Sequence, residues 1–215
     1  MIYKNLPQKN HIKFVCERNF LYLCSVKSIT NQTNGVMNKK TNLDGSLRGY
    51  IADTAYVADT AYVYGNAKVY GNAEVYGDAE VCGNAKVYGN AKVCGNAVVS
   101  DNAVVNDNAV VNDNAVVNGN AKVRGDAKVL GSAVVSGNAE VSDNAVVSNI
   151  SDYIVFKNWW SSGRYFTWTR SNDMWRVGCF YGTGYELVAK ACEDSEESGK
   201  QYAAIVAYVD AIKQD

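Results

Sequence analysis

Residues 67–99 read AKVYGNAEVYGDAEVCGNAKVYGNAKVCGNAVV and repeat a single unit of six residues. A β-branched aliphatic residue recurs at every sixth position from Ile51 to Val147, seventeen times without a gap. From Val57 onward an alanine stands two residues before each of them, sixteen times from Ala55 to Ala145. The unit A-x-V-x-[GD]-[ND] therefore governs nearly half of the chain.

The six-residue period predicts one short strand and one turn in each unit. Alanine and valine two positions apart point to the same side of an extended segment, and the following Gly-Asn type of pair tolerates left-handed backbone angles at a corner. Three units close a triangular coil, and successive coils stack about 4.8 Å apart. Because no unit can bury its own apolar edge, the units are stable only in a stack whose two ends are capped.

This repeat resembles the bacterial hexapeptide-repeat family. The resemblance implies a left-handed parallel β-helix of about five coils and a homotrimer. The left hand comes from the resemblance alone, because ordinary crossover connections favour the right hand. The fold class we expect is mainly β, with a left-handed solenoid over residues 51–150 and a small α+β module over residues 151–215.

The residues that make such solenoids into enzymes are missing from the repeat. The family's acyltransferases use a histidine base and a covering loop, and its carbonic anhydrases hold a metal with three histidines. Residues 51–215 contain no histidine, and no loop interrupts the repeat between Ile51 and Val147. We therefore expect no catalytic residue, no metal and no cofactor. An acyltransferase that binds an acyl-CoA donor between protomers stays as an alternative.

Residues eighteen positions apart should share a column on one outer face of the solenoid. Val98, Val116 and Val134 form one such column. Exposed apolar columns usually mark a contact surface. We expect these three valines to mediate self-association, or to dock the C-terminal module.

The C-terminal module should contain three strands and two helices. Aromatic and β-branched runs begin at Tyr153 and Tyr165, and a third run covers residues 174–180, with turn residues between them. Thr183 and Glu186 have the spacing of a capping box that opens a helix through about Cys192. A second helix is expected from Ser195, where an apolar stripe recurs at helical spacing.

Residues 175–183, with the sequence WRVGCFYGT, resemble a tail module found behind hexapeptide repeats in phage and prophage proteins of gut bacteria. The resemblance implies a phage-encoded protein that acts on a host macromolecule, including host defence machinery. The leading functional expectation is a non-catalytic interaction or scaffold protein that presents its C-terminal module to a protein partner.

Tryptophans alternate with basic residues in the module and form a set of partner-binding candidates. Such a pattern suits stacking on nucleic acid, but it equally suits inward core aromatics with outward arginines. A formal net charge of −1 argues against general nucleic-acid binding. The candidates are Trp159, Trp160, Arg164, Trp168, Arg170, Trp175 and Arg176.

Residues 1–50 form a basic segment that we expect to cap the first coil. They carry eight Lys/Arg against two Asp/Glu, so 8 − 2 = +6. The alternation over residues 11–16 predicts one or two short strands. No stretch approaches the roughly 20 apolar residues that cross a bilayer and no signal-peptide pattern is present, so we expect a cytoplasmic protein without membrane association.

Overall fold

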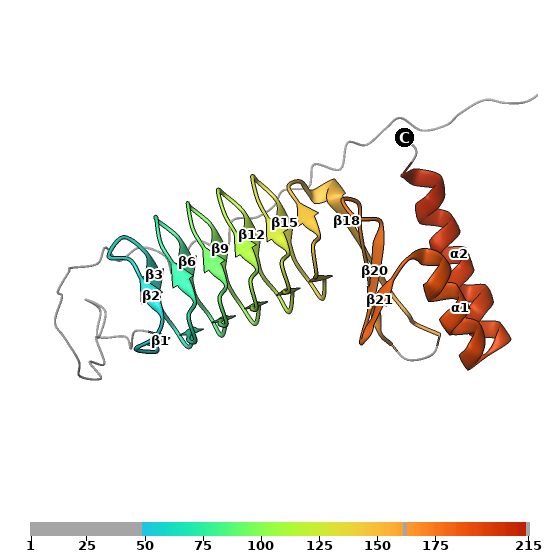
Figure 1. Cartoon of the computed structure of the whole chain (residues 1–215), viewed down its shortest axis with the longest axis horizontal. Helices are drawn as coiled ribbons and strands as arrows, with labels where there is room; N and C mark the ends of the chain where they lie inside the picture. Colours follow the sequence, from blue (N-terminus) through green and yellow to red (C-terminus); the bar gives the residue numbers. More distant parts are fainter. Residues whose placement is uncertain (1–48, 161–162, 214–215) are drawn as a thin grey trace, which may run out of the picture.

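The computed structural model describes residues 49–160 and 163–213, and it confirms a mainly β architecture. A parallel β-solenoid of about five turns is followed by a small antiparallel sheet and then by two helices (Figure 1). The hand of the coil stays a prediction from the family resemblance. The expected N-terminal cap, with its strands near residues 11–16, lies outside the described residues.

The solenoid has three faces, and each is a parallel sheet of two-residue strands. The first face contains β1 (Tyr50–Ile51), β4 (Lys68–Val69), β7 (Lys86–Val87), β10 (Val104–Val105), β13 (Lys122–Val123) and β16 (Glu140–Val141). The second face contains β2 (Tyr56–Val57), β5 (Glu74–Val75), β8 (Lys92–Val93), β11 (Val110–Val111), β14 (Lys128–Val129) and β17 (Val146–Val147). The third face contains β3 (Tyr62–Val63), β6 (Glu80–Val81), β9 (Val98–Val99), β12 (Val116–Val117) and β15 (Val134–Val135).

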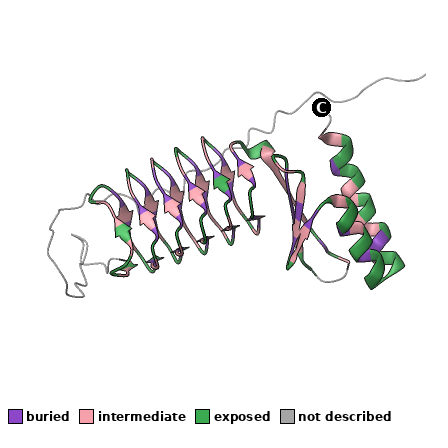
Figure 2. Ribbon diagram, in the orientation of Figure 1, coloured by how far each residue is buried: buried purple, intermediate pink, exposed green. Residues whose placement is uncertain are grey.

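Neighbouring strands on every face are eighteen residues apart, as the three-unit coil requires. Val116, for example, pairs with Val98 on one side and with Val134 on the other. The repeated alanines and valines fill the interior, and from Ala61 to Val147 they are at most 2% exposed. Burial of one valine contributes roughly 1.5–3 kcal/mol before chain ordering is counted. The interior is thus one continuous apolar column, and buried positions recur along the coils of the solenoid (Figure 2).

The corners are held by glycine, aspartate and asparagine. Gly77 has φ +73°, and a Cβ there would lie 2.8 Å from the carbonyl oxygen of Gly95. Aspartate replaces glycine at four such positions, each with a φ near +60°. At three of them its carboxylate accepts a hydrogen bond from an amide of the next coil, as Asp107 does from Gly125 at 3.1 Å. Asparagine side chains form ladders along the corners; the longest joins Asn66, Asn84, Asn102, Asn120 and Asn138.

The module contains four strands, so the expectation of three is corrected. After a 3-10 turn, η1 (Ile150–Asp152), the strands are β18 (Tyr153–Lys157), β19 (Tyr165–Thr169), β20 (Met174–Val177) and β21 (Phe180–Gly182). They form one antiparallel sheet in the order β18-β19-β20-β21. The predicted third strand is broken at Gly178, whose φ of +60° turns the chain back on itself.

Both predicted helices are confirmed. Helix α1 (Gly184–Asp194) begins with the capping box of Thr183 and Glu186. Helix α2 (Glu196–Ile212) begins at Ser195, whose hydroxyl accepts a hydrogen bond from the amide of Ser198 at 3.0 Å. Across residues 49–160 and 163–213, neither the length nor the apolarity of any helix suffices for a membrane span.

The module sheet lies between the solenoid and the helices (Figure 1). One face of β18 turns Tyr153 and Val155 toward the solenoid core. The opposite face of the sheet contributes Phe166 and Trp168 of β19 and Trp175 of β20 to a second core with α1 and α2. The sheet therefore caps the C-terminal end of the solenoid.

Candidate interaction site

Three hydroxyl side chains of the module bind the open end of the solenoid. The last strand on each face would otherwise leave backbone amides without a following coil. Thr167 Oγ1 accepts from the Glu140 amide at 2.9 Å, and Ser171 Oγ accepts from the Val146 amide at 2.8 Å. The Tyr153 hydroxyl accepts from the Ser136 amide at 3.3 Å and donates to the Val134 carbonyl at 3.0 Å. Each face thus receives one hydroxyl cap, which gives its amide the acceptor that a further coil would supply.

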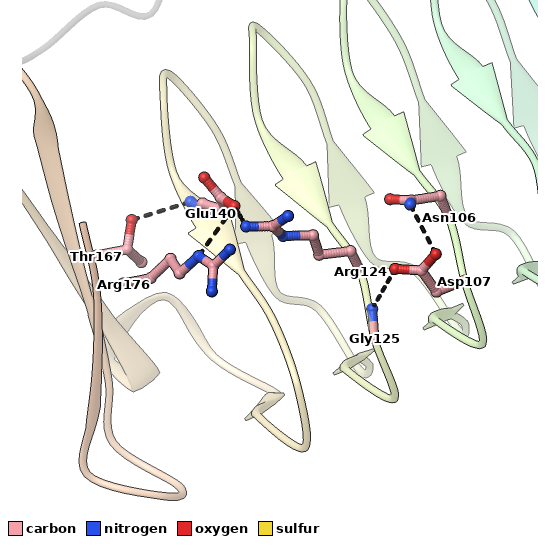
Figure 3. Close-up of polar contacts among 7 residues, drawn as sticks. All are labelled: Asn106, Asp107, Arg124, Gly125, Glu140, Thr167 and Arg176. Carbon is pink, nitrogen blue, oxygen red and sulfur yellow. Dashed lines mark hydrogen bonds and ion pairs between the residues drawn. The ribbon is translucent and has the colours of Figure 1, made fainter. Parts of the chain in front are cut away.

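An ion cluster joins the same two parts (Figure 3). The Glu140 carboxylate accepts from Arg176 Nε of β20 at 3.2 Å and also pairs with the Arg124 guanidinium of the preceding coil. The side chain of Glu140 is only 17% exposed. Removal of one partner from a poorly exposed cluster leaves an uncompensated charge. Arg176, a partner-binding candidate from the sequence, therefore has a contact within the molecule.

An open groove of about 500 Å³ lies beside this junction. In it Asn172 Nδ2 donates to Asn144 Oδ1 at 3.0 Å and to the Tyr181 hydroxyl at 3.2 Å. Burial and then the nearby Asp143 carboxylate raise the pKa of Tyr181 above its ordinary value. The groove is lined by Gly125, Asp126, Asp143, Asn144, Asn172, Met174 and Tyr181. Its lining residues offer hydrogen bonds and negative charge, but they include no histidine or cysteine.

The apolar column predicted from the sequence exists as a column. Val98, Val116 and Val134 point outward from adjacent strands of the third face, and all three are half-buried. The backbone carbonyl of Val134 accepts a hydrogen bond from the Tyr153 hydroxyl of the module. The module thus touches the end of this column and leaves its length uncovered by described residues.

The seven partner-binding candidates separate into different environments. Trp168 and Trp175 are each 2% exposed and pack in the core of the module, as the core interpretation of the alternation expects. Trp160 is half-buried, and its indole nitrogen has no hydrogen-bond partner among the described residues. Trp159 is 83% exposed, and Arg164 and Arg170 are exposed as well. The candidates thus do not converge on one site.

Two exposed tyrosines of the helices were missed by sequence reasoning. Tyr185 of α1 is 84% exposed, and Tyr208 of α2 is 55% exposed. The Tyr208 ring packs edge-on against Phe156 of β18, with ring centroids 6.0 Å apart. Tyr208 stands three residues after Ile205 and four before Ile212, so it borders the apolar stripe of α2, and helical phase alone does not reveal its exposure.

Within residues 49–160 and 163–213, His, Cys, Asp and Glu side chains nowhere gather in threes that could hold a metal ion. No family model, no curated protein and no solved structure matches the chain.

Proposed function

We propose that this is a non-catalytic interaction or scaffold protein whose rigid solenoid presents the C-terminal module to a protein partner. In this proposal the solenoid is left-handed, as in the hexapeptide-repeat family. The resemblance of residues 175–183 to a phage tail module supports a phage-encoded protein. Its partner is then a host macromolecule, such as a component of the defence machinery, met in the cytoplasm.

The observation that carries the proposal is that the module holds several exposed aromatic side chains on a fixed support. Trp159, Tyr185 and Tyr208 are each more than half exposed. Aromatic residues are enriched at the centres of protein interfaces, where they bury large areas. The hydroxyl caps and the Glu140 cluster hold the sheet on the solenoid, so these side chains are presented with little loss of conformational freedom on binding.

The alternatives have less support. An acyltransferase needs a base within hydrogen-bond reach of its substrate, and residues 51–215 contain no histidine to supply one. Nucleic-acid binding would use tryptophans and arginines together, but Trp168 and Trp175 lie in the core and Arg176 pairs with Glu140. A protein partner therefore suits the surface better than either alternative.

Self-association through the valine column is the second part of the proposal. Three copies would meet at the third face and bury Val98, Val116 and Val134. Light scattering should give the mass of a trimer for the wild type and of a monomer for Val116→Lys. Val104→Glu, on the first face between Lys86 and Lys122, is the control and should leave the mass unchanged. A monomeric wild type would contradict this part.

Quantitative affinity capture from a bacterial host lysate tests the partner. The tagged full chain is compared with a Trp159→Ala/Tyr185→Ala double variant and with Lys86→Ala, which changes an exposed residue of the solenoid. We expect the double variant to recover about tenfold less of a discrete protein than the wild type, and the solenoid variant to recover as much as the wild type. Equal recovery with all three chains would contradict the proposal.

A further inference from the structure

Strand β18 forms an edge of the module sheet. Its residues pair with β19 on one side only, from Tyr153 opposite Thr169 to Lys157 opposite Tyr165. Edge strands with unpaired backbone groups are templates for another strand unless something blocks them. No proline interrupts β18. Its first four residues, Tyr153–Phe156, are half-buried.

The hydrogen bonds at both ends of β18 show which of its backbone groups face outward. The Asn158 amide donates to the Arg164 carbonyl, and the Arg170 amide donates to the Asp152 carbonyl. In an antiparallel pair, bonded and non-bonded residue pairs alternate, so the even-numbered residues bond to β19. The N–H and C=O groups of Tyr153, Val155 and Lys157 consequently point away from β19, and no described residue bonds to them.

These groups define the chemistry of the occupant. They present alternating donors and acceptors, with about 6.8 Å between successive odd-numbered residues. Only an extended polypeptide backbone offers the same alternation at that spacing. On the helix side the exposed Tyr208 ring flanks Phe156, and Lys157 is exposed at the end of the strand. The edge therefore suits a segment with alternating apolar residues and an acidic residue beside Lys157.

A second copy of the chain does not fit this edge. Antiparallel pairing of β18 with itself requires a two-fold axis perpendicular to the sheet, next to the strand. Tyr153 and Val155 pack against the solenoid core, so β18 lies over the end of the solenoid. Such an axis would bring two solenoids into the same space.

We propose that the free edge of β18 binds an extended segment of the protein partner as a fifth strand of the module sheet. This inference rests on the proposed function and specifies how the partner is recognised. Strand addition takes affinity from main-chain hydrogen bonds and specificity from alternate side chains. Tyr208 and Lys157 would then select the partner's sequence.

Val155→Pro blocks the edge, and Val155→Ala is its matched control. Both variants shorten the side chain that packs on the solenoid, but only proline removes the outward N–H. Because that N–H makes no bond to β19, proline leaves the ladder intact, as edge positions tolerate. Equal thermal stability of the two variants would verify that the sheet is preserved.

The probe is a synthetic octapeptide of alternating threonine and valine that ends in glutamate. Its control is the same peptide with alternate amides methylated. Fluorescence anisotropy with the full chain should show binding of the unmethylated peptide to the wild type and to Val155→Ala. Methylation or Val155→Pro should weaken binding about tenfold or more. Equal binding in all cases, or no binding to the wild type, would overturn the proposal.

Amide hydrogen exchange of the full chain tests the competing occupant, which is another part of the chain itself. The amides of Tyr153, Val155 and Lys157 should exchange quickly, and those of Ile154 and Phe156 slowly. Protection of all five would show that the edge is already occupied and would overturn the proposal. If Val155→Pro leaves partner capture intact while Trp159→Ala/Tyr185→Ala abolishes it, this inference fails but the proposed function stands.

Discussion

The solenoid and the module reach a stable core in opposite ways. In the solenoid one local rule recurs, so every buried valine contacts alanines and valines of neighbouring units. In the module Phe166, Trp168 and Trp175 come from different strands and meet helices that lie further along the chain. The solenoid shows how repetition fixes a shape from six residues. The module shows that the end of a repeat is capped by particular side chains whose positions follow no repeat.

The difference divides structural and functional roles between the two regions. The coil itself requires no particular side chain at its outward positions, so Lys68, Glu74 and Val98 occupy equivalent places. In the module, by contrast, the residues that face the solenoid cap its last coil, and several outer aromatic residues are exposed. Variation at the solenoid surface should therefore cost less than variation at the junction.

The largest effect should come from a charge in the solenoid core. Val117→Asp places a carboxylate at a site that is 0% exposed, and we expect it to reduce the free energy of unfolding by about 4 kcal/mol or more. Val116→Asp, one residue earlier on the outer side, should cost far less in the monomer. Urea unfolding measures both. Equal losses of unfolding free energy in the two variants would contradict the placement of Val117 on the inner side and Val116 on the outer side of the strand.

Disruption of the junction cluster should produce the next largest effect. Glu140→Gln leaves Arg124 and Arg176 without their shared carboxylate, and we expect a loss of about 1–3 kcal/mol. Hydrogen exchange should show faster opening of β18–β21 and unchanged exchange in β5–β12. Lys92→Gln, which breaks the exposed pair with Glu74 on the solenoid, is the control and should cost under about 1 kcal/mol. Faster exchange in the solenoid alone would refute this role.

Loss of one hydroxyl cap should have a smaller effect. Thr167→Val keeps the shape of a side chain that is 1% exposed but removes the acceptor for the Glu140 amide. We expect a loss of about 1–2 kcal/mol in chemical unfolding. Thr54→Val removes an exposed hydroxyl bond to Gly71, where water can substitute, and should be close to neutral. A neutral Thr167→Val would show that the cap does not contribute to docking.

The smallest effect should appear at alkaline pH. The pKa of Tyr181 is raised in the folded protein by burial and by Asp143, and that of Tyr70 by burial and by Tyr88. A folded-state pKa above the unfolded value contributes stability that is lost as pH rises through the folded pKa. Stability measured from pH 8 upward should therefore fall less steeply in Tyr181→Phe and in Tyr70→Phe than in the wild type. A steeper fall of stability with pH in either variant would contradict a raised pKa of that tyrosine in the folded protein.

The solenoid could be predicted from the sequence because its contacts repeat the chain's own period. The eighteen-residue register, the buried alanines and valines, and the ion pair of Glu74 with Lys92 all follow from counting positions. The helix starts at Thr183 and Ser195 followed from local capping patterns. These features depend on residues close in sequence or related by a fixed interval.

The junction and the module surface could not be predicted in the same way. Thr167 and Glu140 are 27 residues apart and belong to no common period. The break at Gly178 depends on a single left-handed residue inside an apparently continuous strand. The tryptophan and arginine alternation fits a core and a binding surface equally well, and only packing distinguishes Trp168 in the core from the exposed Trp159.

Site-specific photo-cross-linking tests most directly whether the partner contacts the module. A photo-reactive phenylalanine derivative replaces Trp159 or Tyr185 on the module, or Lys86 on the first face of the solenoid, and the full chain is irradiated in host lysate. We expect a discrete adduct with one host protein from positions 159 and 185 and none from position 86. An adduct from position 86 alone would place the contact on the solenoid and contradict the proposed function.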